Sequence, residues 1–138
     1  MCECTPLIAV VDDERSVRKA LERLLRSVGY RVEVFESGRE FLGSLRISVP
    51  DCIVLDLHLQ GMTGYEVQAQ MAQEGVRVPV IIITGHDTPE SRQRAMGQGA
   101  IAYLSKPMDD VLLVGAIASA LAASRGASKS DAPERRDP

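Results

Sequence analysis

The stretch that decides the fold is Leu7-Ile8-Ala9-Val10-Val11-Asp12-Asp13, an unbroken apolar run that stops at two aspartates. A short apolar run without polar alternation is typical of a strand that is buried on both faces, as in a parallel sheet. The pattern returns twice: the run 52–55 stops at Asp56, and the run 78–83 stops at Thr84. We therefore predict three central strands, each of which ends at a polar residue.

Helical spacing separates these strands. Apolar residues recur at intervals of three or four after the first strand, where Ser16 is predicted as the N-cap and Gly29 as the stop: Val17, Leu21, Leu24, Leu25 and Val28. Two more strands are expected at 31–34 and 100–105. Four more helices are expected: around 41–45, around 67–71, from a Thr88 cap to Gly97, and from Asp109 past Leu121. Five strand–helix alternations predict an α/β fold with a doubly wound parallel sheet.

Length and composition limit the chain to one domain and a tail. The 138 residues and 15.0 kDa suit one domain, and 45% hydrophobic with 25% charged residues is ordinary for a globular protein. The apolar pattern fades near Ala127, where Ser, Lys, Asp, Pro and Arg take over. We expect a domain over residues 1–125 and a disordered tail or linker over 126–138.

Several classes of function are disfavoured by the same numbers. No apolar run reaches the length of a membrane span, and no secretory signal is visible at the start, so we expect a cytoplasmic protein. A net charge of −3 argues against direct binding of nucleic acid. Three cysteines, an odd number, indicate reduced thiols. Cys2 and Cys4 have the spacing of a metal clip, but without a second pair of ligands a frayed end is the better interpretation.

Polar residues collect at the carboxyl ends of the predicted strands, where ligands bind in open α/β sheets. They are three carboxylates, a hydroxyl and an ammonium: Asp12, Asp13, Asp56, Thr84 and Lys106. Carboxylates that repel one another at close range need a cation, and oxygen ligands favour Mg²⁺. Each residue alone is more often a loop acid, a turn residue or a solvated lysine. Their joint occurrence predicts a Mg²⁺-dependent phosphoryl-transfer site in which a carboxylate is the nucleophile.

The chain resembles the receiver domain of bacterial two-component response regulators from about Leu7 to Ser124. The motifs that carry the resemblance are Val11-Asp12-Asp13-Glu14, Leu55-Asp56-Leu57, Gly61-Met62-Thr63-Gly64, Ile83-Thr84-Gly85 and Tyr103-Leu104-Ser105-Lys106-Pro107. With His86, the Thr84 motif looks most like receivers of the FixJ type. The resemblance implies a flavodoxin-like (βα)5 fold with strand order 2-1-3-4-5.

The resemblance also implies a role for each residue of the site. Asp56 would be the phosphoacceptor, and Asp12, Asp13, Asp56 and the backbone carbonyl of His58 would hold Mg²⁺. Thr84 and Lys106 would contact the phosphoryl group, and Tyr103 would rotate inward as Thr84 moves. The Lys106–Pro107 peptide is expected to be cis. The donor would be a sensor histidine kinase, and the surface formed by helix 4, strand 5 and helix 5 would pair two receivers on phosphorylation. Such a chain is a signalling receiver, not an enzyme acting on other substrates.

Two departures from the family pattern leave the amplitude of switching open. Gln60 stands where proline is common, and Met108 stands where an aromatic residue is frequent. His58 and His86 each lie two residues beyond a site residue, so we hypothesise that they set the lifetime of the acyl phosphate. The alternative is that both are solvated loop residues of no consequence.

Three rival functions fit the sequence less well. A haloacid-dehalogenase-type phosphatase would carry an acid where His58 stands. A nucleotide-binding domain would need a glycine-rich fingerprint, which the sequence lacks. A degenerate receiver that binds a partner without being phosphorylated would need a reason that the five site residues do not supply.

Overall fold

The computed structural model describes residues 5–130, and it describes the side chains of residues 5–124. One sheet of five parallel strands has the order β2-β1-β3-β4-β5. The strands are β1 (Leu7–Val11), β2 (Arg31–Phe35), β3 (Cys52–Asp56), β4 (Val80–Thr84) and β5 (Ala102–Ser105). Every residue of β1, β3 and β4 is buried, as the unbroken apolar runs predicted. The predicted fold class and strand order are confirmed.

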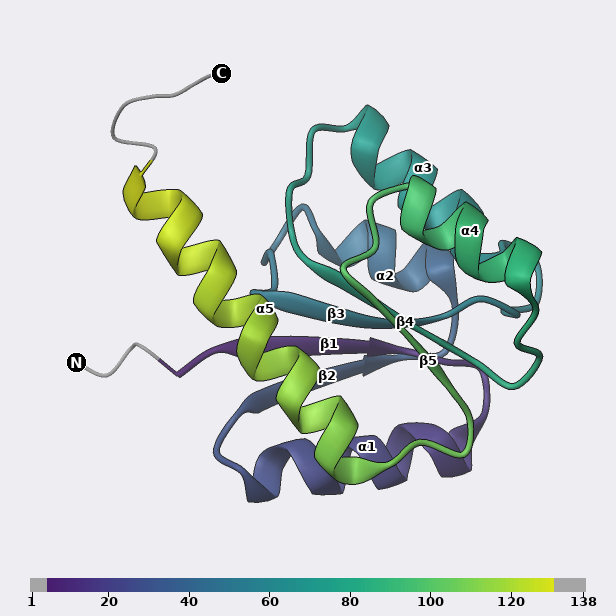
Figure 1. Ribbon diagram of the computed structural model, residues 1–138, viewed down its shortest axis with the longest axis horizontal. Helices are drawn as coiled ribbons and strands as arrows, with labels where there is room; N and C mark the ends of the chain where they lie inside the picture. The colour runs from purple at the N-terminus through teal and green to yellow at the C-terminus, as the bar shows by residue number, and fades with distance from the viewer. Residues whose placement is uncertain (1–4, 131–138) are drawn as a thin grey trace.

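Helices cover both faces of the sheet (Figure 1). They are α1 (Arg15–Ser27), α2 (Gly38–Ser44), α3 (Gly64–Gln73), α4 (Pro89–Gly97) and α5 (Asp110–Ser130). One core, which contains Phe41, Val67 and Ala95, lies under α2, α3 and α4. A second core, which contains Leu25 and Ile117, lies under α1 and α5. The two cores leave the strand ends as the places where polar groups can meet.

Side chains that accept a backbone amide mark where two of the helices begin. Ser37 and Thr88 cap α2 and α4, and the Thr88 cap is the one that the sequence predicted. The prediction of Ser16 as the cap of α1 was wrong. Glu14 holds the N-cap position without a side-chain cap bond, because the Asp12 carboxylate accepts the Glu14 amide at 2.8 Å and turns the chain into the helix earlier.

Two strands begin later than predicted. β4 starts at Val80 because Pro79 has no amide hydrogen for the ladder, although its carbonyl accepts the amide of Ile53 at 3.0 Å. β5 starts at Ala102, after Gly99 leaves the end of α4 with a φ of 106°. These shifts affect only the starts of the two strands, so the polar residues at their carboxyl ends remain at the predicted positions.

Some predictions fall at or beyond the ends of the described chain. α5 runs to Ser130, and residues 131–138 lie outside the described residues, so the disordered tail over 126–138 stays a prediction. Cys2 and Cys4 also lie outside them. Among the described helices, none combines the length and the apolar character that a bilayer crossing requires. The free thiol of Cys52 is buried, and burial raises its pKa to about 12, which leaves it unreactive.

Candidate functional site

Three carboxylates meet at the carboxyl end of the sheet. Asp12 and Asp13 follow β1, Asp56 ends β3, and one oxygen of each lies within 4.8 Å of the others. Asp12 and Asp56 are almost fully buried, with exposed fractions of 0% and 3%. The sheet order explains the meeting, because β1 and β3 are neighbours and run in parallel. The three aspartates that the sequence selected are thus brought together.

Lys106 reaches into this cluster from the end of β5. Its Nζ lies 2.8 Å from Asp12 Oδ2, 3.2 Å from Glu14 Oε1 and 3.4 Å from Asp56 Oδ2. The Lys106–Pro107 peptide is cis, as predicted. One ammonium therefore faces three carboxylates, and the part of Glu14 in holding it was not predicted.

The charges of the cluster are only partly balanced. Burial raises the pKa of Asp56, the negative charge of Asp12 raises it further, and the His58 amide and Lys106 lower it. Burial alone would lower the pKa of Lys106, but its carboxylate neighbours, Asp12 foremost, outweigh burial and raise it. Asp12 Oδ2 is buried, and the partner described for it is the Lys106 ammonium 2.8 Å away, which also faces Glu14 and Asp56. A hard cation bound by these oxygens fits this imbalance.

Backbone amides fix the remaining carboxylate oxygens. The His58 amide donates to Asp56 Oδ1 at 3.2 Å, and the Gln60 amide donates to Asp13 Oδ2 at 3.2 Å. The loop after β3 turns back at Gly64, whose amide donates to the Leu57 carbonyl at 2.9 Å. A Cβ at position 64 would lie 2.6 Å from the Asp56 carbonyl oxygen, so only glycine allows this approach. In the sequence, Gly64 stands out only as the last residue of the Gly61-Met62-Thr63-Gly64 motif.

Thr84 and Tyr103 lie on the side of the sheet that α4 covers. Thr84 is fully buried at the end of β4, where its hydroxyl accepts the His86 amide at 3.0 Å and its carbonyl accepts the Lys106 amide at 2.7 Å. Tyr103 is 5% exposed, so its ring points inward. Its hydroxyl has no hydrogen-bond partner among the described residues; burial and the nearby charge of Asp87 raise its pKa.

The two histidines of the chain face each other beside the cluster. His58 and His86 are both exposed, and their ring centroids lie 6.0 Å apart in an edge-to-face arrangement. The loops that follow β3 and β4 therefore lie next to each other at these two residues. The proposed effect on the acyl phosphate stays a hypothesis.

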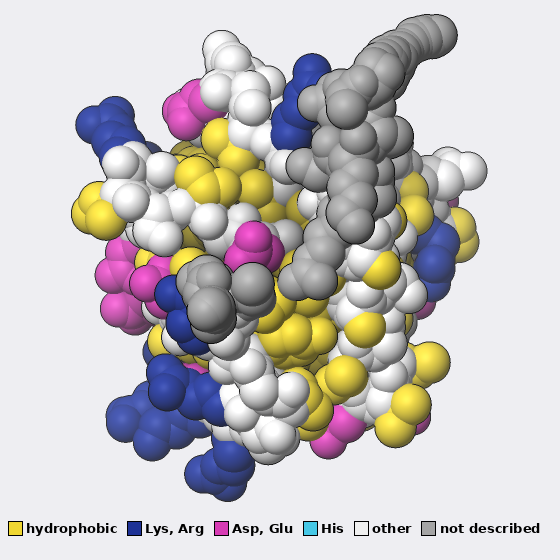
Figure 2. All heavy atoms as spheres, turned by 90° about the vertical axis from the view of Figure 1, so that its left-hand side faces the viewer, with side chains coloured by type: hydrophobic (Ala, Val, Ile, Leu, Met, Phe, Trp, Pro, Cys, Tyr) yellow, Lys and Arg dark blue, Asp and Glu magenta, His cyan; other side chains and the backbone are white. Residues whose placement is uncertain are grey.

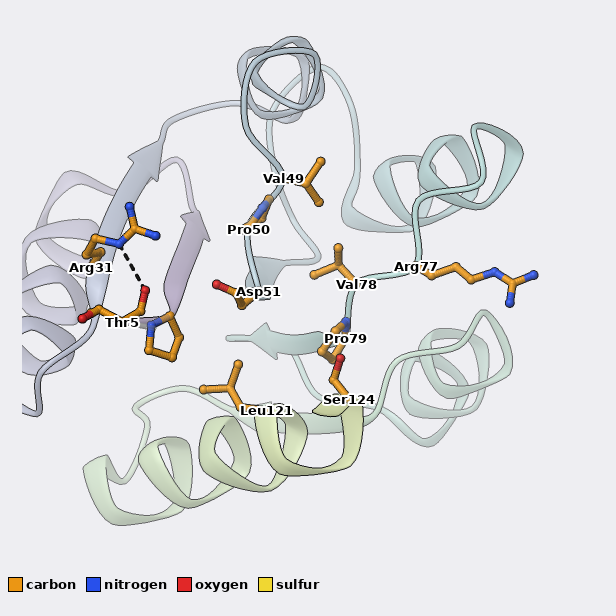
Figure 3. Close-up of a pocket in the computed structure, with 11 residues that line it drawn as sticks. Thr5, Arg31, Val49, Pro50, Asp51, Arg77, Val78, Pro79, Leu121 and Ser124 are labelled. Atoms are coloured by element: carbon orange, nitrogen blue, oxygen red, sulfur yellow. Dashed lines mark hydrogen bonds between the residues drawn. The ribbon is translucent and has the colours of Figure 1, made fainter. Parts of the chain in front are cut away.

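The opposite end of the sheet has a different character. Figure 2 looks along the strands from their amino ends and shows hydrophobic side chains gathered in the middle of this face. A cavity of about 730 Å³ opens there (Figure 3), and its apolar lining is Pro6, Val49, Pro50, Val78, Pro79 and Leu121. Arg31 stands at its edge with Nε 3.2 Å from the Thr5 carbonyl oxygen. Among the groups of acidic, histidine and cysteine side chains described, only the cluster at the carboxyl end could hold a metal.

Contacts around α4 were not predicted. The Arg92 guanidinium lies 4.7 Å from the centroid of the Tyr103 ring, and Arg94 lies 4.0 Å from that of Tyr65. The Gln68 amide donates to the Ala95 carbonyl at 3.2 Å. Such pairs depend on how each helix is rotated about its axis, which a polar sequence such as that of α4 does not reveal. A detectable signal was missed nearby: Thr63 and Glu66 form the capping box of α3, and they have its spacing.

Comparison with known proteins identifies relatives over most of the chain. A family model described as the response regulator receiver domain matches residues 8–118. Nodulation protein W of Bradyrhizobium diazoefficiens is 41% identical over 114 residues, which cover 83% of this chain and 50% of that protein. Response regulator protein TodT of Pseudomonas putida is 36% identical over 121 residues, with coverages of 88% and 53%. The chain spans about half the length of these curated relatives.

A solved structure agrees with these matches. The crystal structure of a response regulator receiver protein from Burkholderia phymatum superposes with a TM-score of 0.77 at 45% identity. The match covers 86% of this chain and 96% of that one. The family match over residues 8–118 includes the strand ends that carry the carboxylates.

Proposed function

Because the chain belongs to the response regulator receiver domain family, we propose that it is the phosphoacceptor of a two-component phosphorelay. An oxygen of the Asp56 carboxylate attacks the phosphorus of a phosphohistidine on a sensor kinase. The new bond is the P–O bond of an acyl phosphate, and the P–N bond to the histidine breaks. The observation that carries the proposal is the buried Asp56 carboxylate, flanked by two further carboxylates and by Lys106. The FixJ-type assignment remains a prediction.

Each residue of the site has a separate role in this reaction. Asp12, Asp13 and Asp56 are the residues that would hold Mg²⁺, together with the His58 carbonyl, and the ion supplies charge that offsets the phosphoryl oxygens. Lys106 is already within 3.4 Å of Asp56 and binds a phosphoryl oxygen. The Thr84 hydroxyl binds another. Tyr103 follows Thr84 and reports the change to the surface of α4, β5 and α5. The chain catalyses only its own phosphorylation and dephosphorylation.

Intact mass after incubation with acetyl phosphate tests the proposal. We expect one phosphoryl adduct in the wild type with Mg²⁺, none when EDTA replaces Mg²⁺, and none in Asp56→Asn. Asp109→Asn is the matched control, because Asp109 caps α5 outside the cluster: its carboxylate accepts the Val111 amide at 2.8 Å. An adduct that persists in Asp56→Asn would refute Asp56 as the acceptor.

We propose further that phosphorylation pairs two copies of the chain through α4, β5 and α5. Large apolar side chains are exposed on these elements or next to them: Met96 (41%), Ile101 (46%), Val111 (79%) and Leu112 (60%). No charged residue occurs in the stretch 111–124 of α5. This uncharged stretch of α5 can meet its own copy without burying an unpaired ion.

Light scattering of the phosphorylated protein tests this pairing. We expect the phosphorylated wild type to be a dimer and the phosphorylated Leu112→Glu variant to be a monomer. Ile47→Glu is the control, because Ile47 is 90% exposed and lies outside these elements, between α2 and β3. A wild type that stays monomeric when fully phosphorylated would contradict the proposal.

A further inference from the structure

Helix α4 is held at its two ends by different means. Ala95 is its one buried residue, so little apolar burial anchors it. The second half is tied to α3, which lies beside it (Figure 1): Gln68 donates to the Ala95 carbonyl at 3.2 Å, and Gln98 donates to the Tyr65 carbonyl at 3.2 Å. Arg94 adds a cation–π contact with Tyr65. The second half of α4 is therefore fixed to a neighbour outside the phosphorylation site.

The first half of α4 depends on Arg92. None of the ion pairs among the described residues includes Arg92; its described contact is with the face of the Tyr103 ring, 4.7 Å from guanidinium carbon to ring centroid. This half directly follows the loop that begins at Thr84. Arg92 thus joins the part of α4 next to the site to strand β5.

The inward position of Tyr103 is not fixed by its hydroxyl. That oxygen is buried, and although the Asp87 carboxylate is near enough to raise the pKa of Tyr103, no hydrogen bond to the hydroxyl forms within the described chain. In the β4–β5 register, Tyr103 pairs with Ile82 and Ser105 pairs with Thr84. Side chains alternate along a strand, so Thr84 and Tyr103 project from the same face of the sheet. What keeps the ring on this face is packing from inside and the Arg92 guanidinium from outside.

We propose that Arg92 is a positioning residue for phosphorylation, whose guanidinium holds the Tyr103 ring in the buried orientation that the phosphorylated site requires. The inference rests on the proposed function of Asp56 and Thr84. Because the apparent affinity for a ligand falls with the populated fraction of the competent state, loss of this contact weakens phosphorylation from a distance. By reciprocity, phosphorylation tightens the contact between Arg92 and Tyr103.

The test combines fluorine NMR with a phosphoryl analogue. The full chain is labelled with 3-fluorotyrosine, and the Tyr103 resonance is assigned with Tyr103→Phe. Titration with beryllium fluoride in Mg²⁺ gives the half-saturating concentration. In Arg92→Ala we expect the Tyr103 resonance to shift or broaden without ligand, and the half-saturating concentration to rise about two- to fivefold. Arg92→Lys keeps the cation and restores part of both effects.

Arg94→Ala is the matched control on the same helix. It removes the same kind of contact from Tyr65 and should move the Tyr65 resonance while leaving that of Tyr103 in place. An unchanged Tyr103 resonance in Arg92→Ala would overturn the proposal, and so would an equal loss of affinity in both arginine variants. If the wild type bound no beryllium fluoride, the proposed function itself would fail. The ligand-free resonances would then still decide whether Arg92 holds Tyr103.

Discussion

Strand β3 has an aspartate at each end, and the two behave differently. Asp51, just before the strand, is exposed, and its carboxylate accepts the Leu7 amide at 2.8 Å. Asp56, the last residue of the strand, is 3% exposed and lies among two other carboxylates and a lysine. The same side chain is a structural acceptor at one end of the strand and a buried, poorly balanced charge at the other.

The direction of the strands accounts for this difference. In a parallel sheet all strands run in the same direction, so their carboxyl ends lie at the same end of the sheet. The residues at the carboxyl ends of β1, β3 and β5 therefore lie close together. The amino ends converge as well, but there the loops bring prolines and valines that line a cavity (Figure 3). Burial without full compensation costs free energy, and such groups persist where function requires them. The carboxyl end of the sheet is thus the end that we propose reacts, and the amino end is the one that stabilises the fold.

The largest expected contrast is in phosphorylation. Asp56→Asn should abolish the phosphoryl adduct, because the amide oxygen is not a nucleophile, whereas Asp51→Asn should leave the adduct at the wild-type level. Intact mass measured after matched incubation with acetyl phosphate and Mg²⁺ compares the two. Loss of the adduct in both variants would erase the distinction between the ends of β3.

A substitution that crowds the backbone at the carboxyl end should be disruptive, as a substitution of its charged residues is. Gly64→Ala places a methyl group 2.6 Å from the Asp56 carbonyl oxygen, and we expect it to lower the free energy of unfolding by about 1–3 kcal/mol. Gly43→Ala is the control, because a methyl group there meets nothing within 4 Å; it should stabilise α2 by about 0.4–1 kcal/mol. Urea denaturation measures both. Equal effects of the two changes would show that the close approach at Gly64 carries no constraint.

These two ends also show what the sequence can and cannot predict. Asp12, Asp56 and Lys106 were found because each stands at the carboxyl end of a predicted strand, and the topology of a parallel sheet then brings them together. The contact of Arg92 with Tyr103 could not be found that way, because it depends on the rotation of a helix with one buried residue. Ser16 was chosen as a cap from local preference, and the Asp12 carboxylate overrode it.

At the amino end the expected effect is on stability alone. Asp51→Ala removes the acceptor of the Leu7 amide and should lower the free energy of unfolding by about 0.5–1.5 kcal/mol, the usual net value of such a bond. Asp51→Asn retains an acceptor oxygen and should cost less. Thermal or urea unfolding of the two variants measures these changes in stability. If Asp51→Ala left the free energy of unfolding unchanged, Asp51 would have no structural role.

Asp56 should also give the stability of the metal-free protein a pH dependence that can be measured without any phosphodonor. Burial and the charge of Asp12 raise the pKa of Asp56 above 3.8, so its carboxylate destabilises the metal-free protein at neutral pH. In EDTA, Asp56→Asn should be more stable than the wild type, although Lys106 offsets part of the repulsion. The difference should shrink as the pH falls through the pKa of folded Asp56, because protonation then removes the same charge from the wild type. Unfolding free energies between neutral pH and pH 4 test the sign, and a gap that widens on acidification would refute it.

The smallest expected effects concern the exposed rim of the reactive end. His58 and His86 stand on neighbouring loops with ring centroids 6.0 Å apart, and both lie two residues beyond a site residue. If the rings order or obstruct the attacking water, His58→Ala and His86→Ala should each change the lifetime of the acyl phosphate. We expect a change of about two- to tenfold in the lifetime, which corresponds to about 0.4–1.4 kcal/mol in the barrier to hydrolysis. Because the rings are neighbours, the double variant should deviate from the product of the two single effects.

Decay of the adduct, followed by intact mass after removal of acetyl phosphate, gives the lifetimes of the two single variants and the double variant. Three lifetimes equal to that of the wild type would reduce both histidines to solvated loop residues and confine the reactive end to its buried groups.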